Sequence, residues 1–413
     1  MPTITPFSSV RPRADLADRI AALPYDVYNR AEAAAIVTTE PLSFLRIDRA
    51  ETNFPDDVGP YDDRVYDKAR ELMEHMIADQ SFIIDDQPAY YIYELTMNGR
   101  TQTGLVACSA IEDYENNLIK KHEKTRTDKE LDRICHVDIT NAHTGPIFLV
   151  YRSHKYINTL IDTAKQSTPE YDFTSDDDIR HRVWILAETT TIDAIKDAFA
   201  DLPATYIADG HHRCASAVKV GFKRRAANPD HTGTEEYNRF LSVLFPDDQL
   251  CILPYNRVVA DLNGLTTAEL LSAIKDHGFT VDYMGNQPVT PVAKGTFGMY
   301  LEDGWYQLTA APSLHVDDPV DGLDVSLLQN HLLQPILGIN DPKTDGRIDF
   351  VGGIRGLGEL EKRVANDMTV AFSLYPTSIE ELLTVADADL LMPPKSTWFE
   401  PKLRSGLFIH PLS

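Results

Sequence analysis

YIADGHHR, at residues 206–213, combines the end of a β-branched strand with the start of a helix. The first backbone N–H groups of such a helix lack intrahelical partners and carry partial positive charge. Gly210 allows an anion to approach the backbone closely. His211, His212 and Arg213 follow it and supply further donors that suit a phosphate. The pattern predicts an anion-binding site where the strand meets the helix.

Two other interpretations of this stretch stay open. It fits a plain Asp-capped helix with solvated histidines, or a divalent-metal site that Asp209 forms with one histidine. Adjacent residues of a helix point about 100° apart, so His211 and His212 rarely bind one metal together. Two histidines and an arginine side by side in a chain of formal charge -24 favour the anion site.

Outward from this stretch, helical and extended patterns alternate, with hairpins between some of them. Asn98-Gly99 is a good turn between extended stretches at 89–96 and 101–111. PLSFLRID at 41–48 also has the pattern of a strand. The mixture predicts an α+β protein, with mixed sheets and flanking helices, rather than a purely doubly wound fold.

The length of 413 residues suggests two or three domains at about 150 residues each. We divide the chain into an N-terminal α/β region at 1–150, a core at 151–260 that holds the DGHHR element, and a C-terminal α/β region at 261–413. The first region contains a HEKT segment and the last contains a KSTWF tail.

The composition limits the partners and the compartment. Asp and Glu number 63 against 39 Lys and Arg, and this negative field repels nucleic acid and anionic membranes. The four cysteines form no C-x-x-C pair, which indicates a reducing compartment. No signal peptide and no run of about 18 apolar residues is visible. We expect a cytoplasmic protein that binds neither nucleic acid nor membrane, with its oligomeric state open.

A second segment, KKHEKTR at 120–126, is the densest basic stretch of the chain. Lys129, Asp132 and Arg133 follow it. The segment could close over a phosphate donor, where cations neutralise the transferring oxygens. An ordinary solvated loop and helix explains it equally well. The candidate donor-binding residues here are Lys124, Thr125, Arg126 and Arg133.

Two further segments carry candidate groups. Lys395, Ser396 and Thr397 could bind an anion, although Trp398 and Phe399 beside them favour a packed tail. In LPYDV at 23–27, Asp26 could act as a base or a metal ligand, or could stabilise a turn. The chain has no G-x-x-x-x-G-K-[ST], G-x-G-x-x-G, G-x-S-x-G or H-E-x-x-H motif, so a standard nucleotide-binding loop is excluded.

Taken in order, these segments resemble, over nearly the whole chain, a bacterial and archaeal family known as the domain of unknown function number one thousand and fifteen. The resemblance rests on LPYDV at 23–27, SFLRID at 43–48, HEKT at 122–125 with DR at 132–133, PIFLVY at 146–151, IADGHHR at 207–213 and MPPKSTWFEPKLRSGL at 392–407. Through the DGHHR element alone, that family is similar to the ParB and sulfiredoxin superfamily.

The second resemblance implies a ParB/sulfiredoxin-like strand–helix unit, with nucleotide phosphates at the start of the helix that carries G-x-x-R. Some members of that superfamily phosphorylate free L-serine to O-phospho-L-serine. The resemblance implies that Gly210, His211, His212 and Arg213 bind phosphate and that Asp209 is a catalytic or metal-linked carboxylate. His211 stands where sulfiredoxin has its reactive cysteine, which puts that chemistry in doubt, and no DNA-binding helices of ParB are apparent.

The function that we expect is a phosphotransferase that forms O-phospho-L-serine from L-serine and ATP, ADP or pyrophosphate. A Mg²⁺ ion would bridge the donor oxygens, with Asp209 as the best protein ligand. Asp209 and His212 are candidate catalytic residues, and Glu123, Asp26 and Glu188, in that order, are candidates for the base. The alternatives are a phosphoserine phosphatase with the same site and a nucleotide-gated binding or switch protein.

Overall fold

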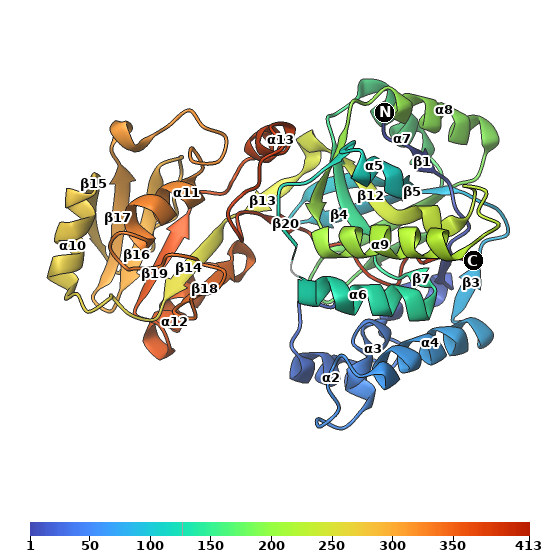
Figure 1. Ribbon diagram of the computed structural model, residues 1–413, viewed down its shortest axis with the longest axis horizontal. Helices are drawn as coiled ribbons and strands as arrows, with labels where there is room; N and C mark the ends of the chain where they lie inside the picture. Colours follow the sequence, from blue (N-terminus) through green and yellow to red (C-terminus); the bar gives the residue numbers. More distant parts are fainter. Residues whose placement is uncertain (126) are drawn as a thin grey trace. The chain divides into compact units, whose positions relative to one another are not determined.

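The computed structural model describes residues 1–125 and 127–413, without the side chain of Asp128 (Figure 1). The chain forms two compact units. The first comprises 1–250 together with 401–413, and the second comprises 251–400. This division differs from the three consecutive regions expected from the sequence. Strands from both sides of residue 150 share one sheet, and the last 13 residues belong to the first unit.

A nine-stranded sheet forms the centre of the first unit, in the order β6-β11-β8-β12-β5-β4-β10-β9, with β1 also paired to β5. Its strands are β1 (Ile4–Thr5), β4 (Tyr90–Met97), β5 (Arg100–Ala110), β6 (Ile119–Lys120), β8 (Ile147–Tyr151), β9 (Tyr171–Thr174), β10 (Arg180–Leu186), β11 (Thr205–Asp209) and β12 (Arg239–Pro246). The β6–β11 and β8–β12 pairs are parallel and the other pairs are antiparallel. The predicted mixed sheet is therefore confirmed.

The first unit also contains several helices. They include α2 (Arg30–Thr39), α3 (Leu45–Asp48), α4 (Asp63–Ala78), α5 (Ile111–Glu115), α6 (Thr127–Thr140), α7 (Lys155–Ala164), α8 (Thr189–Ala200) and α9 (His211–Ala227). Helix α9 buries Cys214, Ala217 and Val218 in the main apolar core, against sheet residues such as Leu149 and Phe240. Helices α6 and α9 lie side by side (Figure 1). This burial stabilises the unit and holds the start of α9 in place.

A second apolar cluster explains why the predicted strand at 41–48 is wrong. Residues 45–48 form helix α3, and Phe44, Leu45 and Ile47 are fully buried against α4. A short apolar run bounded by a proline does not distinguish a buried strand from a buried helix by its periodicity. The tertiary contacts with α4 decide the helix here.

The second unit contains a six-stranded antiparallel sheet in the order β15-β17-β16-β19-β14-β18. Its strands and helices are β14 (Tyr255–Val259), α10 (Thr267–Asp276), β15 (Phe279–Gly285), β16 (Thr296–Leu301), β17 (Gly304–Ala310), α11 (Asp324–Leu328), β18 (Ile348–Gly352), α12 (Leu357–Asn366), β19 (Val370–Leu374) and α13 (Ile379–Asp387). The short strands β13 (Cys251–Leu253) and β20 (Trp398–Glu400) pair where the chain enters and leaves this unit. Among the described residues, no helix is both long and apolar enough to cross a membrane.

Candidate functional site

A turn at Gly210 joins strand β11 to helix α9. Gly210 has φ 90° and ψ 29°, a left-handed conformation that residues with a side chain rarely adopt. The pairing of β11 with β8 shifts register between Ile207 and Asp209, and such a bulge redirects the end of a strand. No side chain of the described residues caps α9. The helix therefore presents its backbone donors at this turn, as an anion site requires.

Asp209 ends strand β11 and forms an ion pair with Lys402. The Lys402 Nζ and Asp209 Oδ2 atoms are 2.8 Å apart, and the Gly210 N–H donates to Asp209 Oδ1 at 2.8 Å. Burial opposes ionisation of Asp209, but the Lys402 ammonium, followed by the Arg213 charge and the Gly210 N–H, holds the pKa of its carboxyl well below the usual range. Asp209 is therefore ionised at neutral pH, and Lys402 neutralises it.

The HEKT segment lies beside this turn. Strand β6 runs parallel to β11, so the residues that follow both strands lie at the same edge of the sheet. The rings of His122 and His211 meet edge to face, with centroids 4.5 Å apart. Both side chains are buried. Burial lowers the pKa of His122 to about 4 and that of His211 well below its usual value, so both are neutral at pH 7.

The other residues of this segment differ in their surroundings. Glu123 is half-buried and Lys124 is exposed. The Thr125 hydroxyl donates to Glu130 on α6, and Glu130 also binds Lys219 on α9. These contacts tie the segment to both helices. Arg126, a candidate from the sequence, lies outside the described residues.

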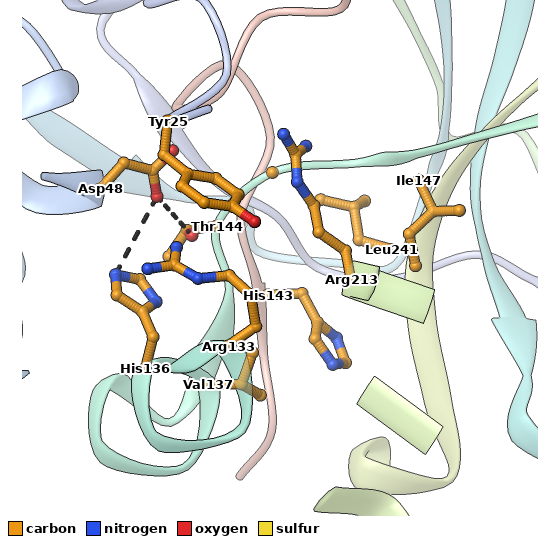
Figure 2. Close-up of a pocket in the computed structure, with 11 residues that line it drawn as sticks. Tyr25, Asp48, Arg133, His136, Val137, His143, Thr144, Ile147, Arg213 and Leu241 are labelled. Carbon is orange, nitrogen blue, oxygen red and sulfur yellow. Dashed lines mark hydrogen bonds and ion pairs between the residues drawn. The ribbon is translucent and has the colours of Figure 1, made fainter. Parts of the chain in front are cut away.

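Next to the turn, Tyr25 lies between two arginines, as Figure 2 shows. The Arg133 guanidinium carbon is 4.0 Å from the centre of the Tyr25 ring, and that of Arg213 is 5.6 Å from it. Asp26 is exposed, and its Oδ1 is 3.8 Å from the Arg213 Nη2 atom. Three of the sequence-predicted segments, at 23–27, 122–133 and 207–213, thus meet in one place.

Two groups of candidates remain. Glu188 precedes α8, where it accepts a hydrogen bond from Thr191 at 3.1 Å, and four strands separate β10 from β11 in the sheet. Lys395, Ser396 and Thr397 belong to the second unit. There the Lys395 ammonium lies 5.4 Å from the centre of the Tyr255 ring, and the Ser396 hydroxyl donates to the Pro393 carbonyl at 2.7 Å.

Sequence reasoning missed Lys402 as the partner of Asp209, because 193 positions separate the two residues. The signal that could have found it is its place in MPPKSTWFEPKLRSGL, one of the segments that carry the family resemblance. It also missed the buried Asp48, His136 and Thr144, which line a pocket beside Tyr25. Asp48 ends the SFLRID segment that contributes to the family resemblance, whereas nothing local in the sequence marks His136 or Thr144.

The turn offers few protein ligands for the expected Mg²⁺ ion. No group of three histidine, cysteine or carboxylate side chains in the described part of the chain is arranged to hold a metal ion. Asp209 is one carboxylate, and it is paired with Lys402. Mg²⁺ usually takes one or two protein carboxylates together with substrate phosphates and water. A Mg²⁺ ion here would need most of its ligands from the phosphate donor.

The chain is similar to one protein family and to several solved structures. A family described as "Protein of unknown function (DUF1015)" matches residues 4–326. No curated protein matches. Among solved structures, the chain is similar to a mutant free serine kinase in complex with ADP (14% identity, TM-score 0.36, covering 74% of this chain and 92% of that one). It is also similar to a conserved hypothetical protein from Pyrococcus furiosus (14%, 0.35, 74% and 95%) and to C-terminally truncated SbnI from Staphylococcus aureus (11%, 0.39, 74% and 87%).

Proposed function

The chain belongs to the DUF1015 family, and from this premise we propose that it transfers a phosphoryl group to the hydroxyl of free L-serine. The observation that carries the proposal is the turn at Gly210. A helix start that no side chain of the described residues caps, a left-handed glycine and an ammonium paired with Asp209 converge there, beside the HEKT segment. This combination suits the phosphates of a donor. The choice of L-serine comes from the resemblance of the DGHHR element to free L-serine kinases.

In the proposed reaction, the α9 start and the side chains of His211, His212 and Lys124 hold the donor phosphates. A carboxylate takes the proton of the serine hydroxyl, the serine oxygen bonds to the terminal phosphorus, and the bond to the leaving phosphate breaks. Glu123 is the first candidate for this base, because it lies next to His122. Asp26 is the second. Glu188 is not a candidate for the base, because it follows β10, and four strands separate β10 from β11 in the sheet.

Mg²⁺ and the donor are further parts of the proposal. When bound to the donor oxygens, Mg²⁺ would neutralise charge on the transferring group. Asp209 is the carboxylate nearest along the chain to the start of α9, where the donor oxygens would lie. ATP, ADP and pyrophosphate all present the phosphate chemistry that the helix start suits.

Phosphorus NMR of the purified protein tests the proposal directly. L-Serine and Mg²⁺ are mixed with ATP, ADP or pyrophosphate in turn, and phosphoserine alone is the reverse test. We expect a phosphoserine signal with one donor and none after chelation of Mg²⁺ with EDTA. Phosphate released from phosphoserine alone would indicate a phosphatase. Nucleotide binding without turnover in any mixture would overturn the proposal and favour a nucleotide-gated switch.

Glu123→Gln is expected to lower kcat at least about 100-fold and to leave donor affinity near that of the wild type, because general-base catalysis typically contributes 10²–10⁴. Steady-state kinetics and equilibrium titration of the donor measure the two quantities. Glu188→Gln, which neutralises a carboxylate away from the site, is the matched control and should retain full activity. Full activity of Glu123→Gln combined with loss in Asp26→Asn would transfer the role of base to Asp26.

Gly210→Ala separates backbone strain from binding. An alanine Cβ would meet no atom nearer than 3.8 Å, so crowding is absent and only the positive φ is unfavourable. We expect the free energy of unfolding to fall by about 1–2 kcal/mol, with donor binding weakened as well. Gly99→Ala has a φ of 78° and open space around it, and should lose similar stability without a change in donor affinity. Equal donor affinity in both variants would remove Gly210 from the phosphate site.

A further inference from the structure

A small pocket beside the turn is lined by five polar side chains, those of Tyr25, Asp48, Arg133, Thr144 and Arg213 (Figure 2). The other lining residues are His136, Val137, His143, Gly145, Ile147 and Leu241. Its cavity of about 30 Å³ has room for about two water molecules. Two such positions match the two oxygens of a carboxylate.

The two arginines keep donors that their ion pairs do not use. Arg133 binds Asp132 Oδ2 through Nε and Nη2, both at 2.9 Å, and this pair does not involve Nη1. Arg213 Nη1 donates to the Pro146 carbonyl at 3.3 Å, while its Nη2 is 3.8 Å from Asp26, beyond hydrogen-bonding distance. Arginine donors of this kind bind a carboxylate or a phosphate.

The charges around the pocket favour a carboxylate over a phosphate. Asp48 is buried in the wall, where its Oδ1 accepts a hydrogen bond from Thr144 at 3.0 Å. Burial and the nearby Arg133 charge lower the pKa of His136, which leaves it neutral at pH 7. Burial also raises the pKa of Tyr25 to about 12, so its hydroxyl keeps its proton. Asp132, Asp26 and Asp48 already offset much of the charge of the two arginines, so the pocket suits the single charge of a carboxylate better than the two charges of a phosphate.

We propose that this pocket binds the α-carboxylate of the amino acid acceptor through Arg133 and Arg213, beside Tyr25. The inference rests on the proposed function and names the part of the acceptor that the site recognises. It differs from the sequence-based expectation that Arg133 and Arg213 bind the phosphate donor. The helix start then takes the donor, and the pocket orients the serine hydroxyl toward it.

Binding measurements on the full-length wild-type protein test the pocket without requiring turnover. Isothermal titration compares L-serine with L-serine methyl ester and ethanolamine, which lack a free carboxylate, and with 3-hydroxypropionate, which lacks the amine. We expect the loss of the carboxylate to weaken binding at least 30-fold and the loss of the amine to weaken it less. Binding of ethanolamine as tight as that of L-serine, or no binding of L-serine at all, would overturn the inference.

Arg213→Lys and Arg133→Lys retain the charge and remove the planar fork of donors. Each should raise the KM or Kd of L-serine at least tenfold and change donor affinity less than twofold. Arg11→Lys is the matched control, because Arg11 is a similarly buried arginine that pairs with Asp85 at 2.8 Å outside this pocket. The reverse result, with weaker donor binding and unchanged serine binding, would assign the pocket to phosphate and overturn the inference.

The two proposals fail in different ways. If L-serine binds through its carboxylate and no donor phosphorylates it, the proposed reaction fails and the pocket assignment stands. If phosphoserine forms but ethanolamine is phosphorylated as efficiently as L-serine, the reaction stands and the pocket assignment fails. Circular dichroism of each variant confirms that the comparison is made on folded protein.

Discussion

Lys402→Met is expected to weaken binding of the phosphate donor about 10- to 100-fold, the range that a charge-assisted interaction supports. Lys402 neutralises Asp209 at a distance of 2.8 Å, directly beside the start of α9. Without the ammonium, a carboxylate of unbalanced charge would face the incoming phosphates and repel them. Equilibrium titration of the donor that supports turnover, at low and moderate salt, measures the effect.

The double variant Lys402→Met with Asp209→Asn determines what Asp209 does. If its carboxylate is only the counter-ion of Lys402, removal of both charges should restore much of the donor affinity. If Asp209 ligates Mg²⁺, the double variant should stay weak. Lys165→Met is the matched control, since Lys165 pairs with the buried Glu94 at 2.6 Å on another part of the sheet. Donor affinity unchanged in Lys402→Met would contradict the assigned role of the pair.

Acidification below pH 6.5 is expected to destabilise the protein strongly, because its buried histidines are neutral in the folded state. Burial lowers the pKa of His122 from 6.5 to about 4 and that of His181 from 6.5 to about 3. As the pH falls through 6.5, the unfolded chain takes up protons that the folded chain does not, so folded stability decreases until the folded pKa is reached. His122 alone should lower the free energy of unfolding by about 3 kcal/mol between pH 6.5 and 4.

The loss of free energy of unfolding from two such histidines approaches the total stability of a typical domain, about 5–15 kcal/mol. Urea denaturation followed by circular dichroism at pH 7.5, 6 and 5 measures the loss. His122→Phe removes one titrating ring while keeping its shape, and should reduce the drop between pH 7.5 and 5 by about 2 kcal/mol. His75→Phe changes a side chain that is 71% exposed and should leave the drop unaltered. A urea midpoint independent of pH over this range would exclude the explanation.

Local patterns in the sequence predicted the strand and helix on either side of Gly210 and much of the mixed sheet. The Asp-Gly pair between a β-branched run and a helical pattern was sufficient, because a positive φ at glycine and the start of a helix are properties of a few neighbouring residues. The run at 41–48 was misread, because Phe44, Leu45 and Ile47 form a helix only through their contacts with α4. The predicted boundary at residue 150 was not found, because β11 and β12 pair with strands from the first 150 residues.

The amino-acid sequence by itself determined which residue types carry charge and donors, and that those around Gly210 suit an anion. Only the tertiary structure decided which distant groups join them. The parallel pairing of β6 with β11 places His122 against His211, and the return of the C-terminal segment brings Lys402 to Asp209. The physical reason is range: backbone conformation follows from neighbours along the chain, whereas an ion pair or a buried ring contact depends on how the sheet closes over its core.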